Sequence, residues 1–249
     1  MTIGRDRIAI ISDPHGNLPA LEAVLADIRE RGIARIFCLG DLAGKGPSGA
    51  EVVDLCRSVC EATVIGNWDS GLADPAETSA VAIWHRAQLG AERVAYLGAL
   101  PAVINLRLSG HHVRLFHASQ VSQNHRVRYA DSDATHLAMF ENTDFTGSGA
   151  LPDIVGYGDI HVGYVKSLES RCLFNAGSVG NPLDVIGACY AILEGVYDGV
   201  AAAPWSVQLV RVPYNIEEAI RQAAAVGMPH LEEYAVELRT AQYQRRPPM

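Results

Sequence analysis

The chain has 249 residues, of which 49% are hydrophobic and 19% charged, and its formal net charge at pH 7 is −8. This balance is typical of a packed globular protein and excludes a disordered chain, which has fewer apolar and more charged residues. The acidic charge disfavours binding to duplex nucleic acid, because such binding depends on clustered Lys and Arg side chains. It does not exclude phosphate substrates, since a bound cation can reverse the local field.

Neither a membrane span nor a secretory signal is expected. A spanning helix needs about 20 consecutive apolar residues, and the most apolar late stretch, residues 188–205, is interrupted by Glu194 and Asp198. The first seven residues contain two arginines and an aspartate and no small-residue cleavage site, so we expect a cytoplasmic protein. The five cysteines show no CxxC spacing, and we interpret them as buried apolar side chains.

The first 65 residues predict the order β-α-β-α-β. Residues 7–12, 35–39 and 62–65 are short apolar runs, as expected of strands covered on both faces. Residues 18–31 and 50–59 carry apolar side chains at helical spacing, and Gly32 ends the first of these helices. Strands that alternate with helices through short connections predict a parallel sheet covered by helices.

The remaining chain predicts one long helix, then mostly strands, then two closing helices. The long helix covers residues 77–97. Strands are expected at residues 103–108, 112–116, 153–155, 163–167, 171–174, 189–193 and 206–212, and helices at residues 216–225 and 230–242. There is no internal repeat and no low-complexity linker.

Polar side chains follow five of the predicted strands, at the sheet edge where ligands gather in open α/β proteins. They are Asp13 and His15, then Asp41, Asn67 and His117, and finally Asp159 and His161. Taken singly, each is more often a helix cap, a turn residue or a packed side chain. Together, three carboxylates, three imidazoles and one carboxamide at one edge would repel each other or be costly to bury unless a cation lay between them.

The types of side chain indicate which metals would bind. Oxygen and nitrogen ligands without cysteine suit Mn, Fe, Zn, Co or Ni rather than a thiolate zinc site or a calcium site. Seven ligands are too many for one ion but suit two ions that share a carboxylate, an arrangement used in phosphoryl hydrolysis. Because the ligands extend from Asp13 to His161, we expect a single domain over residues 1–249.

In these blocks the chain resembles the calcineurin-like metallophosphoesterases, in particular their small single-domain bacterial and archaeal branch of phosphodiesterase type. The likeness extends from Ile8 to about Gly180 and rests on blocks in a fixed order, namely Asp13-Pro14-His15-Gly16-Asn17, Gly40-Asp41-Leu42-Ala43-Gly44, Gly66-Asn67-Trp68-Asp69, His117, Gly158-Asp159-Ile160-His161 and residues 175–180. The resemblance implies an α/β fold, a four-layer α/β/β/α sandwich of two mixed sheets flanked by helices. It also implies a dimetal site at the carboxyl ends of the strands.

The resemblance further implies a role for each candidate residue. The metal ligands would form two groups that share the bridging Asp41: Asp13, His15 and His161 for the first ion, and Asn67, His117 and Asp159 for the second. Mn is the favoured metal. Asp41, Asn67, Asp69 and His125 are the candidate catalytic residues, and Asn175 is expected to orient a ligand histidine.

Two residues depart from the family pattern. Asp159 replaces a usual histidine, which adds negative charge at the second metal. Trp68 replaces the histidine that commonly protonates the leaving oxygen, and an indole has no proton to give at working pH. His125 or water could supply that proton, the substrate could have a good leaving group, or the site could bind without turnover.

We therefore expect hydrolysis of a small phosphate mono- or diester, with nucleotides among the candidates, by a hydroxide that two metal ions activate. Lys45, Arg126 and Arg128 are candidate phosphate contacts, and Trp68 is a candidate stacking partner for an aromatic leaving group. One alternative is a metal-dependent binding or regulatory module. Another is a metal-free nucleotide-binding protein, because residues 44–49 fit the pattern G-x-G-x-x-G. The substrate and the oligomeric state, a homo-oligomer included, are open.

Overall fold

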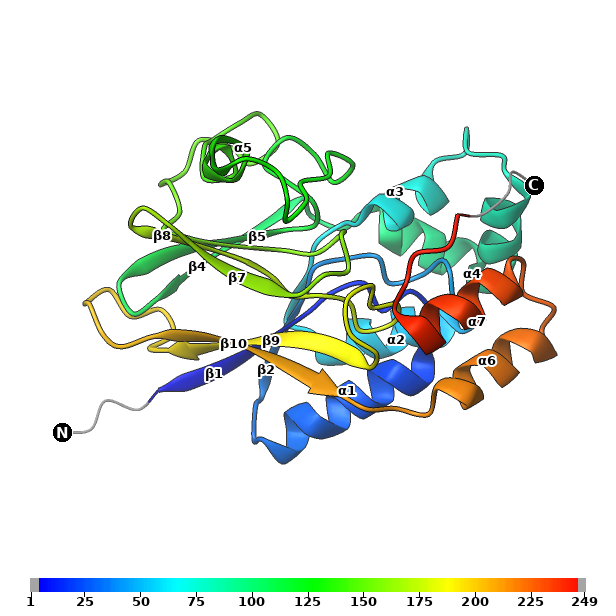
Figure 1. The fold of residues 1–249 in the computed structure, drawn as a ribbon. Coiled ribbons are helices and arrows are strands. Elements are labelled where there is room, and N and C mark those ends of the chain that lie inside the picture. Colours follow the sequence, from blue (N-terminus) through cyan, green and yellow to red (C-terminus); the bar gives the residue numbers. More distant parts are fainter. Residues whose placement is uncertain (1–4, 246–249) are drawn as a thin grey trace.

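The computed structural model describes residues 5–245 and contains two five-stranded sheets (Figure 1). The first sheet has the order β10-β9-β1-β2-β3, with β1 (Asp6–Ile11), β2 (Arg35–Cys38), β3 (Ala62–Thr63), β9 (Ala188–Gly195) and β10 (Ser206–Val212). β1, β2 and β3 pair in parallel as predicted, because a helix returns the chain between successive strands. β9 and β10 add antiparallel pairs, so the sheet as a whole is mixed.

The second sheet has the order β4-β5-β6-β8-β7. Its strands are β4 (Val103–Leu108), β5 (His111–Phe116), β6 (Ile154–Tyr157), β7 (Tyr164–Leu168) and β8 (Arg171–Asn175). The central strands β5, β6 and β8 are parallel to each other, and the edge strands β4 and β7 are antiparallel to their neighbours. The parallel strands of this sheet therefore also end at one common edge.

Seven helices complete the described part of the chain, and two of them were not predicted. They are α1 (Leu18–Glu30), α2 (Gly49–Val59), α3 (Asn67–Ala73), α4 (Ala80–Gly98), α5 (Asp133–Ala138), α6 (Ile216–Ala225) and α7 (Leu231–Thr240). α3 and α5 are too short to show a helical period in the sequence. α4 begins after the cap Ser79, whose hydroxyl accepts from the Ala82 N–H, and it is interrupted at Gly90, where φ is 73°.

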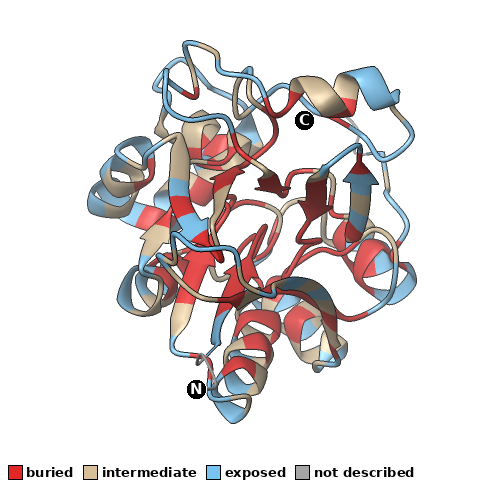
Figure 2. Ribbon diagram, turned by 90° about the vertical axis from the view of Figure 1, so that its left-hand side faces the viewer, coloured by how far each residue is buried: buried red, intermediate tan, exposed pale blue. Residues whose placement is uncertain are grey.

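Three apolar clusters separate four layers and confirm the expected sandwich. One cluster lies between the first sheet and α1, α2 and α4, and includes Ile11 and Val24. The second fills the space between the two sheets, with Ile10 and Leu115 among its members. The third covers the outer face of the second sheet beneath the segment around α5. Figure 2 shows the buried residues concentrated in the strands and on the inner sides of the helices.

Residues 1–4 and 246–249 lie outside the described residues. The expectation of a cytoplasmic protein rested on the first seven residues, and four of these are among them. Within residues 5–245 we find no helix that is both long and apolar enough to cross a membrane. All five cysteines are free thiols, and four of them are buried, as expected of small apolar side chains.

Candidate metal centre

The seven candidate ligands lie together at the edge where the parallel strands of both sheets end. They follow the strands as predicted: Asp13 and His15 after β1, Asp41 after β2, Asn67 in the first turn of α3 after β3, His117 after β5, and Asp159 and His161 after β6. All are buried except Asn67, which is partly buried. The packing of one sheet on the other joins these loops into one site.

The backbone at this edge adopts conformations that are rare for residues other than glycine. Five of the seven residues have positive φ angles, namely 53° at Asp13, 48° at His15, 57° at Asp41, 62° at Asp159 and 59° at His161. A non-glycine residue in this region costs on the order of 1–3 kcal/mol, and such residues concentrate at functional sites. The surrounding fold therefore holds these five side chains in place at a cost to stability.

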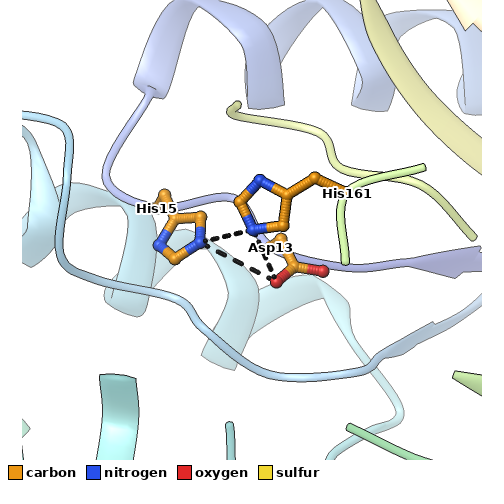
Figure 3. Close-up of side chains that lie close together, drawn as sticks. All are labelled: Asp13, His15 and His161. Atoms are coloured by element: carbon orange, nitrogen blue, oxygen red, sulfur yellow. Dashed lines mark hydrogen bonds and ion pairs between the residues drawn. The ribbon is translucent and has the colours of Figure 1, made fainter. Parts of the chain in front are cut away.

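Asp13, His15 and His161 point toward one another (Figure 3). The Nε2 atoms of the two histidines are 3.1 Å apart, and Asp13 Oδ1 lies 3.2 Å from His161 Nε2 and 3.7 Å from His15 Nε2. Ser12 Oγ donates to the other Asp13 oxygen at 2.5 Å, which leaves Oδ1 toward the histidines. Among the described residues, buried Asp13 Oδ1 has no hydrogen-bond partner.

Backbone carbonyls determine which nitrogen of each site histidine faces the centre. Each Nδ1 atom lies against a carbonyl oxygen: that of His15 at 3.3 Å from Ala43, that of His161 at 2.5 Å from Asn181, and that of His117 at 2.6 Å from Leu39. A carbonyl only accepts, so each neutral imidazole carries its hydrogen on Nδ1 and presents an Nε2 lone pair to the site. This is the tautomer of metal-binding histidines.

Asp41 lies between two clusters of side chains. Its Oδ2 atom is 3.5 Å from Nε2 of both His15 and His117, and its Oδ1 accepts from the Trp68 N–H at 2.8 Å. The inward amide atom of Asn67 lies 2.9 Å from His117 Nε2 and 3.2 Å from both Asp41 Oδ2 and Asp159 Oδ1. Its oxygen in that position adds one more acceptor, and its nitrogen there would instead donate to all three neighbours.

The electrostatics of this group suit divalent cations. Burial, together with the charges of Asp13 and Asp69, raises the pKa of Asp41 well above its usual range. Although burial opposes it, the carboxylates of Asp41, Asp13 and Asp159 raise the pKa of His117 to about 9. Two sets, Asp13 with His15 and His161, and Asp13 with Asp41 and His117, each bring ligand atoms within 4.8 Å of one another. Converging lone pairs in a strongly negative field fit bound metal ions.

Asp69 lies beneath the site and holds backbone rather than facing the cavity. Its carboxylate accepts hydrogen bonds from the N–H groups of Asp41 at 2.7 Å, Leu42 at 3.0 Å and Gly66 at 3.0 Å. These bonds join the start of α3 to the loop that carries Asp41. The structure therefore supports a positioning role for Asp69, whose carboxylate touches none of the candidate ligand side chains that we describe.

Replacing Asp69 with Asn should destabilise the protein and weaken any activity that depends on Asp41. An amide has one acceptor oxygen, so at least one of the three N–H groups loses its partner, which costs about 1–3 kcal/mol in a buried site. Urea denaturation measures this loss. Asp74→Asn is the control, because Asp74 is exposed and its side chain accepts, in the part of the chain that the structure describes, a hydrogen bond only from the Ala76 N–H. Equal stability of the two variants would contradict the positioning role.

The glycine-rich residues 44–49 pack against the loop that carries His15. The Gly46 N–H donates to the His15 carbonyl at 2.8 Å, and a Cβ atom on Gly46 would lie 2.5 Å from that oxygen. Gly16 has a φ of +66°, and a Cβ atom there would lie 2.7 Å from the Gly46 carbonyl oxygen. Gly16 and Gly46 thus allow two loops of the site to touch, which gives Gly46 of the G-x-G-x-x-G pattern a packing role.

The expectation that Asn175 orients a ligand histidine is wrong. Its side chain donates to the Gly158 carbonyl at 2.6 Å and accepts from the Gly177 N–H at 2.9 Å. It therefore shapes the backbone on either side of the site. The three backbone carbonyls described above orient the imidazoles instead, and the sequence has no signal for them, because any residue type supplies a carbonyl.

A cavity of about 690 Å³ opens above the candidate metal ligands. Asp41, Asn67, Asp159 and His161 line it together with Lys45, Trp68, Arg126, Arg128, Tyr129 and Tyr243. All four candidate substrate contacts, Lys45, Trp68, Arg126 and Arg128, line the cavity. His125, the candidate proton donor, is exposed and is not among the lining residues. The two tyrosines were not predicted, since Tyr243 lies far from the motifs in the sequence and Tyr129, although it follows Arg128, belongs to no motif.

The cavity combines cations with aromatic surface. Lys45 Nζ donates to Asn181 Oδ1 at 2.7 Å, and Arg126 forms an ion pair with Asp159 at 2.7 Å. The Trp68 ring stands edge-on to His15, with 6.0 Å between ring centroids, and packs so closely on Gly44 that a Cβ atom there would lie 2.3 Å from the indole. Trp68 therefore forms a wall of the cavity beside the candidate ligands.

Comparison with known proteins identifies the family. The model of the calcineurin-like phosphoesterase superfamily domain matches residues 7–196 of this chain. The chain therefore belongs to the calcineurin-like phosphoesterase superfamily, as the ordered motifs predicted. Phosphoester hydrolysis that depends on metal ions is the activity that this family membership and the cluster of candidate ligands indicate.

Similar proteins share the full length of the fold. The uncharacterized protein MJ0912 from Methanocaldococcus jannaschii is 30% identical over 254 residues, which cover 90% of this chain and 95% of that protein. A metallophosphoesterase from Sphaerobacter thermophilus has a similar structure, with a TM-score of 0.74, 26% identity, and coverage of 95% of this chain and 99% of its own. The hypothetical protein PH1004 from Pyrococcus horikoshii shares the fold, with a TM-score of 0.74, 16% identity, and coverage of 97% and 99%.

Proposed function

We propose that this protein hydrolyses a phosphate mono- or diester with two divalent metal ions bound at the candidate metal centre. The observation that carries the proposal is the convergence of three Nε2 lone pairs on buried carboxylates, with each imidazole fixed in the metal-binding tautomer by a backbone carbonyl. The cavity above them is large enough for a small phosphoester and carries cationic side chains.

The residues divide into two ligand groups. Asp13, His15 and His161 would hold the first ion, Asn67 and His117 the second, and Asp41 would be shared, since its Oδ2 is equally far from an imidazole of each group. Two divalent ions held there would supply an acidified water nucleophile and would stabilise negative charge at phosphorus. Carboxylate, amide and imidazole ligands together suit Mn, Fe, Zn, Co or Ni, and of these we favour Mn²⁺.

The chain's own side chains bind and orient the substrate. Lys45, Arg126 and Arg128 place positive charge along the cavity and attract an anionic phosphoester. Trp68 presents an apolar ring to the leaving group but supplies no proton. The only imidazole among the lining residues described is that of His161, which is a candidate ligand. Water would therefore protonate the leaving oxygen, unless that oxygen is stable as an anion.

Hydrolysis should consequently depend strongly on the acidity of the leaving group. We expect p-nitrophenyl phosphate to be hydrolysed at least about 100-fold faster than phenyl phosphate, because a site without general-acid help forgoes about 10²–10⁴-fold for poor leaving groups. Initial rates with the two esters at saturating Mn²⁺ measure this ratio. Nearly equal rates would show that an acid group reaches the leaving oxygen.

The test of the proposal is an assay on protein that has been stripped with a chelator and reloaded with Mn²⁺. We expect hydrolysis of p-nitrophenyl phosphate or bis-p-nitrophenyl phosphate to appear with Mn²⁺ and to disappear with the chelator, while elemental analysis gives two ions per chain. Failure to bind any divalent metal would reject the metal centre. Metal binding without turnover of a broad panel of phosphoesters would favour the metal-dependent binding or regulatory module.

A further inference from the structure

Asp159 and Arg126 form a forked ion pair at the wall of the cavity. Arg126 Nε donates to Asp159 Oδ2 at 2.8 Å, and Arg126 Nη2 donates to Asp159 Oδ1 at 2.7 Å. The Asp159 side chain is 3% exposed, whereas that of Arg126 is 46% exposed. Both carboxylate oxygens are thus bound to a guanidinium that itself faces the cavity, and such bidentate pairs have a well-defined geometry.

Apart from this fork, the Asp159 carboxylate approaches only the edge of the candidate ligand cluster that we describe. Its Oδ1 is 3.2 Å from the inward amide atom of Asn67 and 3.9 Å from His117 Nε2, compared with 3.5 Å from Asp41 Oδ2 to the same nitrogen. Within the described residues, it belongs to neither of the two sets whose ligand atoms lie within 4.8 Å of one another. A carboxylate that already satisfies a guanidinium through both oxygens is a weak competitor for a metal ion.

The loop that carries Arg126 is anchored at the two residues that follow Arg126. The Val127 side chain is buried, and its carbonyl accepts a hydrogen bond from the Tyr157 hydroxyl at 3.0 Å. The Arg128 carbonyl is 3.0 Å from His136 Nε2 in α5. Arg126 is therefore placed by a packed segment as well as by Asp159, although it lies on an irregular loop between β5 and α5.

The guanidinium keeps donors for a ligand. Arginine has five N–H groups, and the fork with Asp159 uses two of them. Nη1 has no hydrogen-bond partner among residues 5–245, and the side chain lines the cavity beside Asp41 and Asn67. Arginine held in this way matches the paired oxygens of a phosphoryl group.

We propose that Arg126 binds the phosphoryl oxygens of the substrate and that Asp159 is the residue that positions it, rather than a ligand of the second metal ion. This inference rests on the proposed function and assigns to the pair the recognition of the phosphoryl group. The cation that balances Asp159 then comes from the protein itself. The two metal ions would rely on the other six candidate ligands.

Binding of inorganic phosphate to the Mn²⁺-loaded protein, measured by calorimetry, tests the proposal without requiring turnover. We expect Arg126→Gln to raise the Kd for phosphate by about 10- to 100-fold, which is the usual worth of charged hydrogen bonds. Arg126→Lys keeps the charge and loses the fork, so its Kd for phosphate should lie between those of the unmodified chain and Arg126→Gln. Arg221→Gln is the control, because Arg221 lies on α6, is exposed and, within residues 5–245, pairs only with Glu218.

Asp159→Asn separates positioning from metal binding. We expect the variant to bind as many Mn²⁺ ions as the unmodified chain, to bind phosphate more weakly, and to show no further weakening when Arg126→Gln is added. Thermal unfolding shows whether each variant is folded. If Asp159→Asn does not fold, the phosphate Kd of Arg126→Lys still tests the proposal. The loss of one Mn²⁺ ion in Asp159→Asn, or an unchanged phosphate Kd in Arg126→Gln, would overturn the proposal.

These outcomes are distinct from a failure of the proposed function. A Mn²⁺-loaded protein that bound phosphate through Arg126 but hydrolysed no ester would reject hydrolysis and keep the role of Arg126. A protein that hydrolysed esters while Arg126→Gln bound phosphate normally would reject the inference alone.

Discussion

Replacement of Asp41 by Asn should lower Mn²⁺-dependent phosphoesterase activity by at least about 10³-fold, which corresponds to about 4 kcal/mol of lost transition-state stabilisation. A single oxygen of Asp41, Oδ2, lies 3.5 Å from an imidazole of each ligand group. An amide at this position has no negative charge to share between two ions, and its nitrogen cannot bind a metal. Both the affinity for the second ion and the reaction itself should suffer.

Steady-state rates and Mn²⁺ titration of the same samples measure this prediction. Asp54→Asn is a matched control, because it makes the same change in an exposed carboxylate that pairs with Arg93 on the surface. The variant itself should fold, since an Asn oxygen can still accept the Trp68 N–H and burial already disfavours the charged form of Asp41. If Asp41→Asn retained a tenth or more of the activity, Asp41 would not be the shared ligand.

Gly66→Ala is the second change with a large expected effect. A Cβ atom on Gly66 would lie 2.1 Å from Asp41 Oδ1 and 2.4 Å from the Asp41 backbone nitrogen. The backbone of two loops cannot yield as a flexible side chain would, so either the Asp41 carboxylate or the start of α3 must move. We expect activity to fall by about 100-fold, because small displacements of reacting groups have effects of this size, and stability to fall by about 1–3 kcal/mol.

Gly71→Ala controls for the chemical change itself. Gly71 lies in the same helix, α3, and a Cβ atom there would have no neighbour within 4 Å. Alanine favours a helix over glycine, so this variant should retain full activity and gain about 0.5–1 kcal/mol of stability. Urea denaturation and activity assays of the two alanine variants together decide the question. Similar behaviour of both would contradict the steric account of Gly66.

The elements that the sequence predicted best are those with a long or repeated pattern. The parallel strands β1 and β2 and the helices α1 and α2 lie close to their predicted positions. The short helices α3 and α5 were missed, and the break of α4 at Gly90 was not foreseen, because glycine within a helical pattern does not by itself show which φ it adopts. The antiparallel joining of β9 to β1 unites strands that are far apart in the sequence, so local patterns could not show it.

The sequence likewise predicted one part of the candidate site and missed another. Residue types at strand ends identified the seven candidate ligands, since carboxylates, imidazoles and an amide in one order make a recognisable pattern. The role of Asp69 was not evident, because its partners are backbone N–H groups from two different loops. The pairing of Arg126 with Asp159 joins residues that are 33 positions apart, and nothing in either residue's own surroundings predicts it.

The sequence by itself determined the family of this protein, the order of its strands and longer helices, and the set of candidate metal ligands. These properties depend on side-chain type and local spacing, which can be read along the chain. Only the tertiary structure decided which nitrogen of each histidine faces the centre, which N–H groups the Asp69 carboxylate holds, and which carboxylate pairs with Arg126. Those properties depend on contacts of a few ångströms between distant segments, and above all on backbone carbonyl and N–H groups that every residue carries alike.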